Sequence, residues 1–107
     1  MEMVVYVPDD GRGVPQLCRA EDLGALSVRA AAGAPRWELL SRTLGAAGAG
    51  EVAGEHAWLD VAWLRSAAGD RDQNWHDGFT RMLAYASDLG WVSADGGRVR
   101  AHVEWGR

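Results

Sequence analysis

The sequence predicts an α+β fold, and the clearest evidence for it lies in the last third of the chain. Apolar residues between 72 and 89 recur at helical spacing and fall within an arc of roughly 120° at 100° per residue. Residues 98–105 then alternate between apolar and charged side chains, which is the pattern of a half-buried strand. Because an Asp-Gly-Gly turn signal precedes this strand, we expect a β-hairpin over 91–105.

The first half of the chain predicts one further strand and two helices. Residues 3–7 are rich in β-branched side chains and end at a Pro-Asp-Asp-Gly cluster, so they predict a strand. Residues 15–32 carry leucines at helical spacing and predict a helix, although one glycine interrupts it. A short helix is expected from Pro35 to Gly45. The Gly- and Ala-rich stretch 45–54 has few side chains that could pack, so it predicts a flexible loop.

Residues 55–69 do not fit one helix, because a single helix would scatter their large apolar side chains around its whole circumference. A strand near 56–60 resolves the conflict if Asp60 caps a helix that follows it and ends at Gly69. Together the elements predict a small antiparallel sheet made of the N-terminal strand, this central strand and the C-terminal hairpin 91–105. Three to four helices pack on one face of the sheet, and residues 1–107 form a single domain.

Composition narrows the classes of protein to consider. A hydrophobic content of 48% in 107 residues argues against disorder and allows one hydrophobic core. The net charge of −4 at pH 7 does not provide the basic surface that a nucleic-acid binder needs, so we expect no nucleic acid as partner. Cys18 has no second cysteine to pair with, and there is neither a signal-peptide core nor an apolar run of about 18 residues. These features predict a cytoplasmic protein that does not enter a membrane.

The charged face of the last strand is the strongest candidate for chemistry. Strand alternation places Arg100, His102 and Glu104 on one side of the sheet at intervals of about 7 Å. In the functional interpretation His102 is a general acid or base, Glu104 orients it, and Arg100 binds an anionic group. In the structural interpretation the three side chains are the solvated face of an antiparallel strand.

A second group of candidate residues lies on the predicted central strand. His56, Trp58 and Asp60 share one face of this strand by alternation. They would join Arg100 and His102 in a polar and aromatic ligand-binding pocket. The alternative is that Trp58 simply packs in the core or at the flank of the sheet.

Other chemistries have weaker support. The three histidines lack the spacing of a helical metal motif, so we expect neither a metal nor another cofactor. Cys18 has no neighbouring histidine, no serine lies in a Gly-x-Ser-x-Gly turn, and the glycine-rich stretch lacks the lysine of a phosphate loop. Helix, helix and hairpin also follow the order of a winged helix. The outer face of its recognition helix would carry Asp77, Arg81 and Asp88, which repel phosphate more than they attract it.

We therefore expect a small cytoplasmic binding or interaction domain without a catalytic motif. Its partner is another protein or a small anionic or aromatic ligand, and an apolar sheet face or an edge strand would allow a homodimer. The alternative is a small-molecule-binding protein or a small enzyme that uses Arg100, His102 and Glu104 for general acid and base work on an anionic substrate. A third hypothesis is an inhibitor whose acidic surface covers a basic site on another protein.

Overall fold

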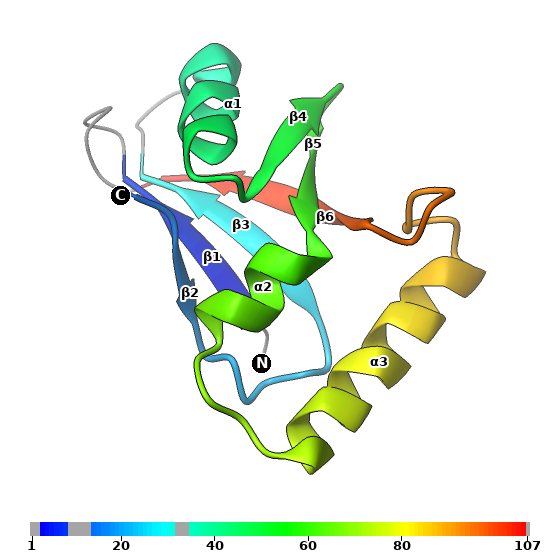
Figure 1. Cartoon of the computed structure of the whole chain (residues 1–107). Helices are drawn as coiled ribbons and strands as arrows, with labels where there is room; N and C mark the ends of the chain where they lie inside the picture. The colour runs from blue at the N-terminus through cyan, green and yellow to red at the C-terminus, as the bar shows by residue number, and fades with distance from the viewer. Residues whose placement is uncertain (1–2, 9–13, 32–34, 107) are drawn as a thin grey trace.

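A six-stranded mixed β-sheet dominates the computed structural model, which describes residues 3–8, 14–31 and 35–106 (Figure 1). The strands are β1 (Met3–Val7), β2 (Gln16–Cys18), β3 (Leu26–Ala30), β4 (Gly50–Ala53), β5 (His56–Asp60) and β6 (Arg98–Trp105). The helices are α1 (Trp37–Ala46), α2 (Val61–Ala67) and α3 (Gln73–Asp88).

The strand order is β2-β1-β3-β6-β5-β4, so the last strand of the chain lies in the interior of the sheet. The pairs β1–β3 and β3–β6 are parallel, whereas β2 and β5 pair antiparallel with β1 and β6. Parallel neighbours require a crossover connection. The chain between β3 and β6 supplies it and contains all three helices. The topology therefore places β6 between strands from the first and the middle part of the chain.

The α+β class is confirmed, but the predicted sheet is wrong in three respects. The sheet is mixed and six-stranded instead of small and antiparallel. The helix predicted over 15–32 is replaced by β2 and β3, because β3 pairs with β1 on one side and β6 on the other and this pairing overrides the leucine spacing. The hairpin predicted over 91–105 is reduced to β6 and a single bridge between Val92 and Val99.

The stretch 45–54, predicted as a flexible loop, also forms regular structure. Its first two residues end α1, and Gly50–Ala53 form β4 against β5. The backbones approach closely at one position: a Cβ atom at Gly50 would lie 2.1 Å from the carbonyl oxygen of Trp58. Glycine at position 50 is therefore a steric requirement of the β4–β5 pair.

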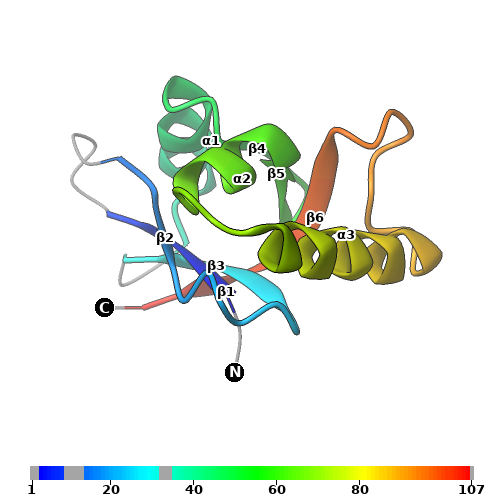
Figure 2. The same cartoon turned by 60° about the horizontal axis from the view of Figure 1, so that its bottom comes forward.

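The core lies between the sheet and the helices. In two views α1 and α2 lie over one face of the sheet, while α3 extends past the starts of β3 and β6 (Figures 1 and 2). The largest fully buried side chains come from both layers and are Phe79, Met3, Leu44, Leu59, Leu64, Val5 and Val28. No helix in the described part of the chain is long and apolar enough to cross a membrane.

Helix α3 is anchored mainly through its N-terminal half. Asp72 caps it by accepting a hydrogen bond from the backbone N–H of Trp75 at 2.9 Å, and the Trp75 indole donates to the Ala20 carbonyl at 2.7 Å. Arg65 of α2 hydrogen-bonds His76 at 2.9 Å and lies 4.7 Å from the ring centroid of Phe79. The C-terminal half is less covered, and its apolar side chains lie beside the start of β3.

Candidate functional site

A pocket opens where β3 and β6 diverge. β3 pairs with β6 only from Ser27 opposite His102 onward, so the first residues of β6 extend beyond the start of β3. The residues before β6 form an arm that lies along the part of β6 left unpaired by β3. Arg100 donates its backbone N–H to the Trp91 carbonyl at 2.7 Å, and Val92 bridges Val99. Between this arm, the start of β3 and the C-terminal half of α3 lies a cavity of about 340 Å³.

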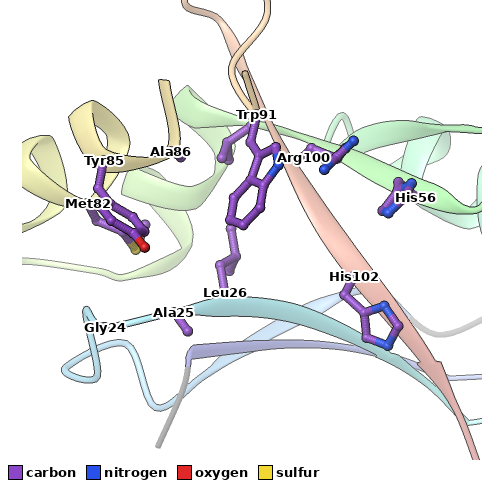
Figure 3. Close-up of a pocket in the computed structure, with 11 residues that line it drawn as sticks. Gly24, Ala25, Leu26, His56, Met82, Tyr85, Ala86, Trp91, Arg100 and His102 are labelled. Atoms are coloured by element: carbon purple, nitrogen blue, oxygen red, sulfur yellow. The ribbon is translucent and has the colours of Figure 1, made fainter. Parts of the chain in front are cut away.

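We call this cavity the fork pocket (Figure 3). It is lined by Gly24, Ala25, Leu26, His56, Met82, Tyr85, Ala86, Trp91, Val99, Arg100 and His102.

The greater part of the fork pocket is apolar. In Figure 3 the Trp91 indole hangs between α3 and β6 above Leu26, and Met82 and Tyr85 project from α3 on the other side. Tyr85 is 65% exposed and Trp91 36%, so both lie at the mouth and are accessible from solvent. Such a cleft buries the apolar body of a small ligand, and its volume is within the usual range of about 300–1,000 Å³.

The polar part of the lining consists of nitrogen-bearing side chains. Arg100 and His56 lie next to one another beside β6 in Figure 3, and His102 points away from them. The guanidinium of Arg100 lies 5.4 Å from the centroid of the Trp91 ring. Within the described residues no acidic side chain lines the pocket or forms an ion pair with Arg100. This guanidinium is therefore available to an anionic group.

Among the described strands, the two other arginines on this side of the sheet are already engaged. Arg98, two positions before Arg100 on β6, forms an ion pair with Glu51 of β4. Arg29 of β3 forms one with Glu104 at 2.9 Å. The contrast with these two pairs makes Arg100 the candidate anion-binding residue.

Three of the six residues that the sequence indicated as site residues line the fork pocket: Arg100, His102 and His56. The register explains why they come together. His56 is the cross-strand partner of His102, and Trp58 is the partner of Arg100. Trp58 is half-buried beside Arg100 and does not line the pocket.

Glu104 and Asp60 lie outside the fork pocket and have other partners. Glu104 is opposite Arg29 in the parallel register of β3 and β6, and its carboxylate forms an ion pair with Arg29, not with His102. Asp60 caps α2, as predicted, by accepting a hydrogen bond from the backbone N–H of Trp63 at 3.0 Å. Both carboxylates have structural roles that account for their positions.

Sequence reasoning missed the apolar wall of the pocket. Leu26 was assigned to a helix and Trp91 to a strand of the hairpin, so neither pointed toward α3. Tyr85 carried the available signal, because it is a large side chain outside the apolar stripe that the sequence predicts as buried, and it is 65% exposed. Leu89 belongs to that predicted stripe, but it is 45% exposed in the structure.

The turn that leads into β6 is held by a carboxylate. Asp95 accepts hydrogen bonds from the Ser93 hydroxyl at 2.7 Å and from the Gly97 backbone N–H at 2.8 Å. These bonds, that of Ser93 first, lower the pKa of the Asp95 carboxyl below its usual value. The side chain is therefore ionised at neutral pH, and it keeps in place the arm that carries Trp91.

Within the described residues, no three histidine, cysteine, aspartate or glutamate side chains come close enough to hold a metal ion. Comparisons of the chain with protein-family models, with curated proteins and with solved structures find no match.

Proposed function

We propose that the protein binds a small organic anion in the fork pocket. The observation that carries this proposal is an apolar cavity of about 340 Å³ whose polar part contains a guanidinium, that of Arg100, without a carboxylate partner among the described residues. The apolar wall would take the body of the ligand and Arg100 its charge. A free thiol at Cys18 is compatible with the reducing cytoplasm as the place where this occurs.

Binding is favoured over catalysis by the composition of the lining. General acid and base work by His102 would need a group that orients its ring, and Glu104, the residue expected to do so, is paired with Arg29. The eleven residues that line the pocket include no serine, cysteine, aspartate, glutamate or lysine, so besides His102 the side chains able to transfer a proton are His56 and Tyr85. The apolar wall and Arg100 are sufficient for binding an organic anion without a reaction.

The test uses 8-anilinonaphthalene-1-sulfonate, an anionic aromatic probe whose fluorescence rises in apolar sites. We expect the folded protein to bind one equivalent, and Arg100→Gln to weaken binding at least tenfold. A hydrogen bond to a charged group contributes about 1.5–3 kcal/mol, and each 1.4 kcal/mol corresponds to about a factor of ten. The dissociation constant is measured by fluorescence titration.

Arg98→Gln is the matched control, because Arg98 lies on the same strand but outside the lining and pairs with Glu51. It should leave the affinity for the probe unchanged. Circular dichroism must show that both variants are folded, since this probe also binds partly unfolded proteins. Equal affinities of wild type and Arg100→Gln would contradict the proposal.

A protein partner, here a second copy of the chain, is the second candidate. It is favoured by the exposure of Tyr85 and Leu89 at the end of α3, because clustered apolar side chains on a surface often mark an interface. We expect a dimer in sedimentation equilibrium at micromolar concentration and a monomer for Leu89→Ser. A monomeric wild type at the highest soluble concentration would contradict this candidate and leave ligand binding unaffected.

A further inference from the structure

We infer that the ligand of the fork pocket is an aromatic acid with a single carboxylate, held with its ring against Trp91 and its carboxylate on Arg100. This inference rests on the proposed function, since it assumes that the pocket binds an organic anion. It adds two restrictions on that anion: the acid group is a carboxylate and not a phosphate, and the body is a flat ring and not an acyl chain.

The charge of the lining restricts the acid group. Arg100 is the only arginine or lysine among the eleven lining residues. A phosphate monoester carries a charge of about −1.5 to −2 at neutral pH, and it usually needs several cations or a helix N-terminus. A carboxylate carries one negative charge and matches one guanidinium, which can donate two parallel hydrogen bonds to it.

The orientation of α3 adds a second argument against phosphate. The helix lines the pocket through Met82, Tyr85 and Ala86, all in its C-terminal half. Aligned peptide dipoles give this end of a helix a partial negative charge. That charge opposes a dianion more strongly than a monoanion.

The side chains of the wall restrict the body of the ligand. The Trp91 indole faces a space bounded by Leu26 below and by Met82 and Tyr85 on α3 (Figure 3). Aromatic rings gain from offset or edge contacts with tryptophan and tyrosine and from contact with a thioether sulfur, whereas an acyl chain gains from burial alone. A flat ring therefore gains more binding free energy from this wall than an acyl chain does.

The position of Arg100 restricts the distance between ring and acid. Its guanidinium lies over the Trp91 ring, 5.4 Å from the ring centroid, so it occupies part of the indole surface and a ligand ring would pack beside it. A carboxylate reaches it when one or two bonds separate the acid from the ring. An arylacetate has this geometry.

The experiment compares four compounds by isothermal titration calorimetry: 1-naphthylacetate, 1-naphthyl phosphate, 1-naphthylmethanol and octanoate. We expect naphthylacetate to bind wild type at least tenfold more tightly than each of the others. Arg100→Gln should abolish the difference between naphthylacetate and the neutral alcohol without changing the affinity of the alcohol. Arg98→Gln should preserve the wild-type order.

The outcomes separate this inference from the proposed function. If naphthyl phosphate or octanoate binds as tightly as naphthylacetate, the inference is overturned, while binding of an organic anion stands. If the anilinonaphthalene probe binds through Arg100 but none of the four compounds does, the inference again fails alone. If neither the probe nor any of the four compounds binds, the proposed function fails as well.

Discussion

Phe79→Ala should lower the free energy of unfolding by about 3–5 kcal/mol, the usual cost of removing a fully buried phenylalanine ring. Phe79 is fully buried on α3, with its ring 5.2 Å from that of Trp75 and under the guanidinium of Arg65. Loss of this ring removes a large part of the apolar packing that holds α3 to the rest of the fold. Because α3 forms one wall of the fork pocket, binding of the anilinonaphthalene probe at the native site should weaken in parallel.

Urea unfolding followed by tryptophan fluorescence measures the change in free energy. Ser87→Ala is the control on the same helix, since Ser87 is exposed and its replacement should stay within about 0.5 kcal/mol of wild type. A loss of less than 1 kcal/mol for Phe79→Ala would mean that α3 contributes little to the stability of the core, contrary to the packing described.

Gly50→Ala should have the next largest effect, a loss of roughly 3 kcal/mol in the free energy of unfolding. Gly50 has a φ angle of 155°, which side-chain-bearing residues rarely adopt. Its new Cβ would lie 2.1 Å from the Trp58 carbonyl oxygen, which is backbone and cannot rotate away. Strands β4 and β5 would have to separate locally, and amide hydrogen exchange should show lost protection over 50–60.

Gly45→Ala is the matched control, because Gly45 lies in α1 and a Cβ atom there would meet nothing within 4 Å. Alanine is the better helix former by about 1 kcal/mol, so this variant should be as stable as wild type or more stable. If the two variants behaved alike, the close approach of β4 and β5 would not be the reason for glycine at position 50.

The candidate site was predictable only in its polar part. Alternation along a strand is a local property, so the sequence was enough to place Arg100 and His102 on one face. The register of β5 then brings His56 to His102. The partner of Glu104 depends on which strand lies next to β6. That strand is β3, and the partner could not be predicted because the sequence predicts a helix there.

By itself the sequence determined α3, the alternating β6 and the cap of α2 by Asp60, because each depends on residues close together in the chain. Only the tertiary structure decided that β6 lies between β3 and β5 and that β3 pairs with β6 only from His102 onward, so that the first residues of β6 extend beyond the start of β3. Strand pairing is a contact between segments that are distant in the sequence, and the side-chain pattern of a five-residue strand is too short to identify the strands that pair with it. The fork pocket exists because of that pairing.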